Sequence, residues 1–218
     1  MAPRTENARS RLLEAAQRLF AEQGVDAVSL RGIIREAGVK HATAVQYHFG
    51  DREGLLAAVM EDDYLRVDTR RDAMLEQYQA EGTPGLRALA AILVRPLAQE
   101  LRDPRGRLFL QIYAQMVLRS QQVHTDTGTS IWRWREYVDP FLPPGTSYLH
   151  PRFTALTFAA VELARRAAEP AHTDDRLFVS RIIDVVAAIL EAPVSVETGR
   201  LQLEREAQMP RRAGGTVA

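Results

Sequence analysis

Apolar residues recur every three or four positions along almost the whole chain, and this spacing limits the fold more than any other feature of the sequence. Residues 8–23 illustrate the pattern, because Leu12, Ala16 and Phe20 share one side of a helix. The strict alternation of apolar and polar residues that marks a strand persists nowhere. We therefore predict an all-α protein.

The composition suits a folded chain and excludes several other classes. The 218 residues are 46% hydrophobic and 26% charged, which is ordinary for a globular protein. There is no cysteine, which excludes a disulfide scaffold, cysteine-ligated zinc and a cysteine nucleophile. The first nine residues lack the apolar core of a signal peptide, and no apolar run is long enough to span a bilayer, so we expect a cytoplasmic protein.

Residues 29–49 are the most informative segment, since they predict two short helices joined by a tight turn. Ser29 is a good N-cap residue, and the apolar stripe that follows it includes Ile33. Gly38 supplies the unusual backbone that ends a helix and turns the chain. A second helix is expected over residues 42–49.

The outer side of this second helix carries groups that suit a DNA major groove. Gln46 can pair with adenine N6 and N7, while Thr43 or Ala42 can pack on a thymine methyl group. Tyr47 and His48 suit phosphate oxygens. The alternative is a purely structural hairpin whose second helix happens to be polar.

The flanking segments favour the DNA-reading interpretation. Upstream, the amphipathic helix over residues 8–23 is closed by Gly24. Downstream, Asp51 caps another helix whose apolar stripe includes Leu55 and Val59. Three helices and the start of a fourth would make a compact DNA-binding domain.

These motifs resemble the N-terminal DNA-binding domain of the TetR family of transcriptional regulators. The resemblance covers residues 8–60 and rests on the order and spacing of LLEAAQRLF (12–20), EQG (22–24), SL (29–30), AGV (37–39) and YHFGDREGL (47–55). One residue more than in the commonest family pattern separates AGV from the His-Phe pair, so Lys40 or His41 is expected to belong to a longer turn.

The resemblance implies that Tyr47, His48 and Arg52 contact operator phosphates and that the helix before them reads bases. Together with the reading of the residues themselves, it defines a set of DNA-binding candidates. This predicted set is Arg31, Lys40, His41, Ala42, Thr43, Gln46, Tyr47, His48 and Arg52.

Net charge is zero, with 28 basic and 28 acidic side chains, whereas a non-specific DNA binder is usually basic. Residues 1–50 nevertheless hold seven basic against five acidic side chains. This modest surplus suits a protein that relies on shape and a few contacts. Arg4 and Arg9 are either a flexible arm toward the DNA or part of a frayed terminus.

The rest of the chain is predicted to be helical. We expect a long helix over residues 55–79, a break at 81–85, a helix over 86–101 kinked by Pro96, and another over 103–120. These helices would begin a regulatory domain over residues 55–192, after a DNA-binding domain over 1–54 and before a mobile tail over 193–218.

A ligand pocket is expected between about residues 85 and 142 if the resemblance extends that far. Trp132 and Trp134 point about 200° apart on a helix, so at most one can face the interior. The pocket would take a hydrophobic small molecule with an acidic group; plain core packing is the alternative. Its predicted residues are Arg95, Phe109, Tyr113, Met116, Arg119, Trp132 and Phe153.

Two strongly apolar helices over residues 147–168 and 174–190 predict a dimer interface. Paired with their symmetry mates they would make a four-helix bundle, the arrangement that the family resemblance implies. The alternative is that both helices pack wholly within one chain. The predicted interface residues are Phe153, Leu156, Ala160, Leu163, Phe178, Ile182, Val186 and Ile189.

Nothing in the sequence predicts an enzyme, a metal site or a cofactor. The histidines at 124, 150 and 172 have no partner four positions away, and no phosphate loop or catalytic motif occurs. We predict a homodimeric regulator, a repressor by family default, whose partners are operator DNA, itself and an unknown effector. The alternatives are a helical binding or enzymatic protein with a structural hairpin, and a DNA-binding regulator without an effector.

Overall fold

The computed structural model describes residues 3–82, 85–119, 129–143 and 150–208, and these contain helices but no strand. The prediction of an all-α fold is therefore confirmed. The helices are α1 (Pro3–Gln23), α2 (Leu30–Glu36), α3 (Ala44–Phe49), α4 (Arg52–Glu81), α5 (Leu86–Ala98), η1 (Gln99–Arg102), α6 (Pro104–Arg119), α7 (Thr129–Val138), η2 (Asp139–Phe141), α8 (Pro151–Ala168), α9 (Arg176–Glu191) and α10 (Val196–Gln208).

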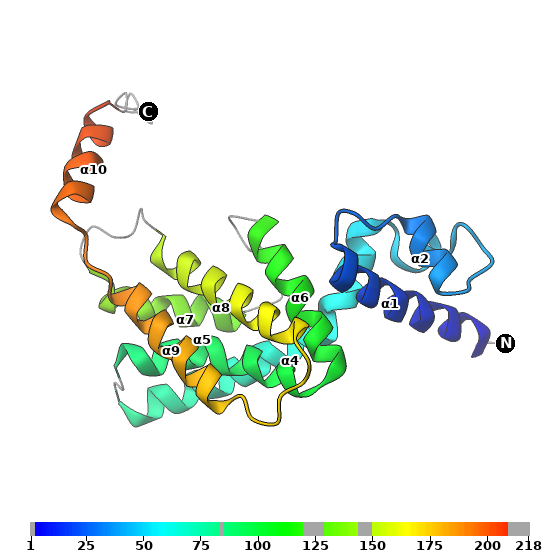
Figure 1. Cartoon of the computed structure of the whole chain (residues 1–218), viewed down its shortest axis with the longest axis horizontal. Helices are drawn as coiled ribbons and strands as arrows, with labels where there is room; N and C mark the ends of the chain where they lie inside the picture. The colour runs from blue at the N-terminus through cyan, green and yellow to red at the C-terminus, as the bar shows by residue number, and fades with distance from the viewer. Residues whose placement is uncertain (1–2, 83–84, 120–128, 144–149, 209–218) are drawn as a thin grey trace, which may run out of the picture.

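The molecule is elongated, with a small helical head at one end and a larger bundle beyond it (Figure 1). α1, α2 and α3 make the head and pack on one another and on the start of α4. α4 has 30 residues and is therefore about 45 Å long, so it runs from the head into the bundle. There it packs against α5 and α7, while α8 packs against α6 and α9.

Buried apolar stripes hold both parts together. In the head, Phe20 and Ile33 are fully enclosed, as the spacing of residues 8–23 and 29–37 predicts. In the bundle, Trp134 of α7 is buried and its indole N–H donates to the carbonyl oxygen of Leu89, 2.8 Å away. Trp132 is 46% exposed, so the two tryptophans diverge as helical geometry requires.

The helix that contains Pro96 continues two residues beyond it, to Ala98, and then tightens into the 3-10 turn η1. A proline removes one backbone donor, and near a helix end the loss affects few hydrogen bonds. α1 also starts earlier than predicted, so Arg9 lies in a helix rather than in a flexible arm. The side chain of Arg4 lies outside the described residues.

The prediction of a mobile tail from residue 193 is wrong for residues 196–208, which form α10. Two local signals mark this helix: the Ser195 hydroxyl accepts from the Thr198 backbone N–H (3.2 Å), and Arg200 pairs with Glu204 one turn later. Figure 1 shows α10 set apart from the bundle, at the end opposite the head. Residues 209–218 lie outside the described residues.

Candidate nucleic-acid interface

The helical hairpin of the head is built by local hydrogen bonds at its ends. The Ser29 hydroxyl accepts from the Gly32 backbone N–H at 3.1 Å and caps α2. Gly38 has a φ of 61°, a left-handed value that favours glycine, and it turns the chain after α2. Both features follow the sequence prediction.

The turn before α3 is longer than predicted, because α3 begins at Ala44 rather than Ala42. Lys40 and His41 lie in this turn, and the Ala44 backbone N–H bonds to the carbonyl oxygen of His41 at 3.1 Å. Thr43 precedes the helix without capping it through its side chain. The turn therefore accommodates the extra residue noted in the sequence.

The outer side of α3 is exposed, whereas its inner side is buried. Ala44 and Val45 pack into the head, while Thr43, Gln46 and Tyr47 face solvent. Tyr47 is 78% exposed, which is unusual for a large aromatic side chain without a binding role. Three predicted residues thus share one accessible helical surface.

The start of α4 fixes the C-terminal end of α3. Asp51 caps α4 by accepting from the Gly54 backbone N–H at 2.8 Å. A Cβ atom on Gly54 would lie only 2.0 Å from the carbonyl oxygen of Phe49. Only glycine therefore lets α4 approach α3 this closely.

Arg52, a predicted phosphate contact, bonds to other residues of the head in this structure. Its guanidinium donates to the carbonyl oxygens of Val25 and Val28, the latter at 2.6 Å, and lies over the ring of Phe20. These contacts tie the start of α4 to the segment between α1 and α2. Arg52 therefore positions the hairpin from within the head.

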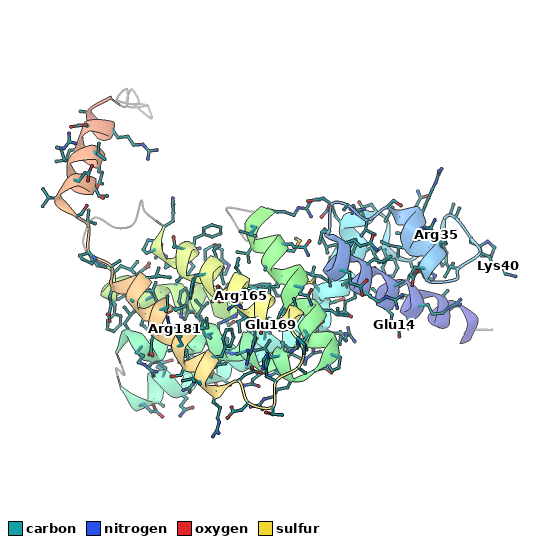
Figure 2. The ribbon with its side chains drawn as sticks, viewed as in Figure 1. Glu14, Arg35, Lys40, Arg165, Glu169 and Arg181 are labelled. Atoms are coloured by element: carbon teal, nitrogen blue, oxygen red, sulfur yellow. The ribbon has the colours of Figure 1, made fainter. Side chains whose placement is uncertain are left out.

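Exposed cations lie on α2 and in the turn before α3. Arg31 and Lys40 are exposed as predicted, and so is Arg35, which the predicted set omits. Within the described residues none of the three forms an ion pair with a carboxylate, whereas the nearby Glu36 is paired with Arg18. Figure 2 shows Arg35 and Lys40 at the end of the molecule farthest from α10. The position of Arg35 one helical turn after Arg31 could have revealed it.

His41 and Ala42 are exposed beside this surface, and His48 is half-buried. His48 contacts the Tyr47 ring edge-on, with ring centroids 4.9 Å apart. Arg9 of α1 reaches the same end of α3, since its guanidinium lies 5.4 Å from the centre of the Phe49 ring. The α3 surface is the name used below for the exposed residues 40–43, Gln46 and Tyr47 together with the cations Arg31 and Arg35.

The predicted pocket residues do not converge. Phe109 and Tyr113 are buried in the bundle and Met116 is half-buried, as their spacing predicts. Arg95 and Trp132, in contrast, are exposed. The prediction is wrong for these two residues. Helical spacing shows which residues share one side of a helix, but not which side other helices cover.

Arg119 is also on the surface, where it pairs with Asp26 of the head at 3.1 Å. One turn earlier on α6, Gln115 accepts from the Val25 backbone N–H (2.7 Å) and donates to the carbonyl oxygen of Phe20 (3.1 Å). The end of α6 is thus fastened to the end of α1. Arg119 belongs to this contact and not to a pocket.

The predicted interface residues of α8 and α9 are mostly interior. Leu156, Ala160, Leu163, Ile182 and Val186 are buried within one chain, so the prediction that they meet a partner is wrong. They cover α5 and α6, which a sequence pattern does not reveal.

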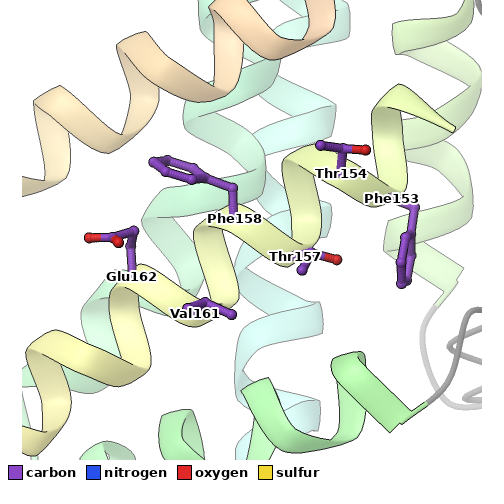
Figure 3. Close-up of a pocket in the computed structure, with 6 residues that line it drawn as sticks. All are labelled: Phe153, Thr154, Thr157, Phe158, Val161 and Glu162. Carbon is purple, nitrogen blue, oxygen red and sulfur yellow. The ribbon is translucent and has the colours of Figure 1, made fainter. Parts of the chain in front are cut away.

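The half-buried remainder of that predicted set is Phe153, Phe178 and Ile189. A shallow groove runs along α8, and Figure 3 shows Phe153 toward one end of its lining and Val161 toward the other. Its lining residues are Phe153, Thr154, Thr157, Phe158, Val161 and Glu162.

The described part of the chain contains neither a metal-binding group of side chains nor a membrane-spanning helix. No group of three or more His, Asp or Glu side chains there could hold a metal ion. No helix among these residues combines the length and the apolar character needed to cross a membrane.

A short helix, a turn and a second helix with an accessible outer side define a helix-turn-helix unit. Residues 12–59 match the family model described as bacterial regulatory proteins, tetR family. This part of the chain therefore matches the N-terminal domain that the family model describes.

The relatives are described as transcriptional regulators. The chain is 35% identical over 109 residues to the HTH-type transcriptional regulator AcrR of Shigella flexneri, covering 49% of this chain and 48% of AcrR. It is 32% identical over 120 residues to the HTH-type transcriptional repressor AcnR of Corynebacterium efficiens, covering 55% and 53%. The matched segment spans about half the length of these curated relatives.

Among solved structures, the chain resembles NalD, described as the secondary repressor of the MexAB-OprM multidrug efflux pump in Pseudomonas aeruginosa. The two are 21% identical with a TM-score of 0.46, and the match covers 85% of this chain and 96% of NalD.

Proposed function

We propose that the protein is a homodimeric, sequence-specific DNA-binding regulator that represses transcription until a small molecule releases it. The observation that supports DNA binding best is the α3 surface, where Gln46 and Tyr47 are accessible and exposed cations flank them. Gln46 supplies a base-reading amide, and Tyr47 supplies a hydroxyl for a phosphate. Two copies would place their α3 helices in major grooves about 34–36 Å apart.

Dimerisation is proposed through the outer sides of α8 and α9. Phe158 and Val161 line the α8 groove, and Leu177 at the start of α9 is 85% exposed. α8 and α9 pack side by side, so these apolar groups lie on adjoining helices. Pairing with a second copy would bury them in a four-helix arrangement.

We propose that a conformational change caused by the effector reaches the head through α4 and α6. Both helices belong to the bundle and contact α1 of the head. An effector that binds preferentially to a form with displaced helices would lower the population of the DNA-competent form. The Gln115 hydrogen bonds would carry a movement of α6 to the end of α1. The coupling must be reciprocal, so operator DNA should weaken effector binding by the same factor.

The DNA-binding role is tested with Gln46→Ala and Tyr47→Ala, using a selected palindromic operator and its base-substituted versions in titrations at fixed salt. Gln46→Ala should cost about 1–3 kcal/mol at its base pair and relax preference there. Tyr47→Ala should weaken binding to all of these DNA sequences by a similar factor.

Gln79→Ala, an exposed glutamine on α4 far from the head, is the matched control for Gln46→Ala. If Gln46→Ala and Tyr47→Ala lower operator affinity no more than Gln79→Ala does, the α3 surface is not the DNA contact.

A further inference from the structure

Arg71 of α4 is a buried cation that, among the described residues, hydrogen-bonds to one partner. Its residue is 5% exposed, and its Nη1 group donates to the Ser130 hydroxyl of α7 at 3.2 Å. Its Nε–H is buried and has no partner. In the described part of the chain no carboxylate lies close enough to form an ion pair with it. Asp68, one turn earlier, accepts instead from the hydroxyl and the backbone N–H of Ser130.

A buried charge is costly when no carboxylate pairs with it directly, and the Asp68 charge acts on Arg71 only from beyond ion-pair distance. Burial lowers the pKa of Arg71, but a guanidinium stays protonated at any physiological pH. Removing such a group from water costs several kcal/mol unless a counter-ion and hydrogen bonds offset it. The Ser130 hydroxyl leaves the Nε–H of this guanidinium unsatisfied, so an anion bound there would offset part of the cost.

Aromatic rings surround this part of the bundle. Tyr64, two turns before Arg71 on α4, meets Tyr113 of α6 with ring centroids 5.6 Å apart. Phe109, one turn earlier on α6, stacks on Tyr113 at the same centroid distance. The Arg71 charge is near enough to act on the pKa of Tyr113, which burial raises, so the phenol stays neutral and can donate its O–H.

We propose that Arg71 binds the carboxylate of a small aromatic acid, which is the effector of the regulator. The guanidinium offers its unpaired Nε–H to a carboxylate, and the rings of Tyr64, Phe109 and Tyr113 offer an apolar wall for the body of the ligand. This inference rests on the proposed function for its regulatory meaning. The ligand would connect α4, α6 and α7, and α4 and α6 both lead to the head.

The test compares 2-naphthoate with 2-naphthamide, a neutral molecule of nearly the same shape, on the full chain. Thermal melting and calorimetric titration are measured without DNA. We expect 2-naphthoate to raise the melting temperature and to bind at least about tenfold more tightly than the amide, because only the carboxylate can form charge-assisted hydrogen bonds. Equal binding of the two, or no binding of 2-naphthoate, would overturn the inference.

Two variants then assign the effect to Arg71. Arg71→Met should remove the preference for the acid, and Arg71→Lys should keep part of it, because a lysine retains the charge but not the planar guanidinium. Arg95→Met, at an exposed position on α5, is the matched control and should bind 2-naphthoate like the wild type. Undiminished binding by Arg71→Met would overturn the inference. Should that variant fail to fold, the acid–amide comparison on the wild type and Arg71→Lys decides the question.

Operator binding is measured separately on the same preparations without ligand. DNA affinity without carboxylate binding contradicts this inference alone. Carboxylate binding without DNA affinity contradicts the proposed DNA-binding function and leaves the Arg71 site supported.

Discussion

At the residue scale, the position of α3 depends on a few contacts at the start of α4. Arg52 donates to two backbone carbonyl oxygens before α2, and Gly54 leaves room for the carbonyl oxygen of Phe49. Gly54 has no side chain, and the Arg52 guanidinium bonds to Val25 and Val28. Both nevertheless decide how Gln46 and Tyr47 are presented.

We expect Gly54→Ala to destabilise the head by about 1–3 kcal/mol, because its methyl group would overlap the Phe49 carbonyl oxygen and force the two helices apart. Operator affinity should fall as well, since α3 moves. Urea denaturation and operator titration measure the two effects. Gly85→Ala, where a Cβ atom meets nothing within 4 Å, is the control. Equal denaturation midpoints for the two variants would show that the close approach of Gly54 to the Phe49 carbonyl oxygen does not affect the free energy of unfolding.

At the element scale, α1, α4, η1 and α6 meet around two buried carboxylates. Asp63 of α4 and Glu100 of η1 are both buried, and Arg66 pairs with each of them. Gln17 of α1 donates to Asp63 at 3.3 Å, and Arg105 of α6 lies 3.7 Å from it. Burial raises the pKa of Asp63 above 3.8; Arg66 and Arg105 offset part of this effect, while Glu100 adds to it.

This raised pKa gives Asp63 a defined effect on stability. The folded state binds the proton more tightly than the unfolded chain does, so the contribution is complete below pH 3.8 and is lost as the pH rises through the folded pKa. The stability of the wild type relative to Asp63→Asn should therefore fall with rising pH over that window. Urea denaturation from pH 3.5 to about 7 measures this difference.

Asp62→Asn is the control for this experiment, because it changes the same group at the adjacent, exposed position. A relative stability of Asp63→Asn that stays constant with pH, or changes in the opposite direction, would refute the effect assigned to burial.

At the scale of the whole molecule, the two sides of α8 have separate roles. Leu163 is fully buried, whereas Val161 is 37% exposed in the groove. The interior of one chain and its proposed contact with a second copy therefore use different residues of the same helix. The proposed dimer can be broken without unfolding the subunit.

We expect Val161→Glu to give monomers with nearly unchanged melting, because a charge at a dimer contact would be buried without a partner. Its operator affinity should fall, since a monomer holds one half-site only. Light scattering after size exclusion measures the mass. Leu65→Glu, which also places a charge at an exposed apolar position but on α4, should remain dimeric. A dimeric Val161→Glu would exclude this side of α8 as the interface.

Most of the helices and the α3 surface could be predicted from the sequence because their signals are local. The caps at Ser29 and Asp51 and the turn at Gly38 each involve residues within a few positions of one another. Buried stripes such as the one through Ile33 also repeat within single helices. α10 was missed despite its Ser195 cap, since Pro193 and the polar composition of the segment favoured a tail.

The sequence by itself determined the helical class of the protein, the helix-turn-helix of its head and the outward direction of Gln46 and Tyr47. Only the tertiary structure decided that Trp134 rather than Trp132 is interior, that Leu163 is enclosed while Val161 is accessible, and that Arg71 is buried. The reason is physical: a helix pattern shows which residues share a side, but packing with segments far away in the chain decides which side is covered. Arg71 meets Ser130, 59 positions later, and no local pattern encodes such a contact.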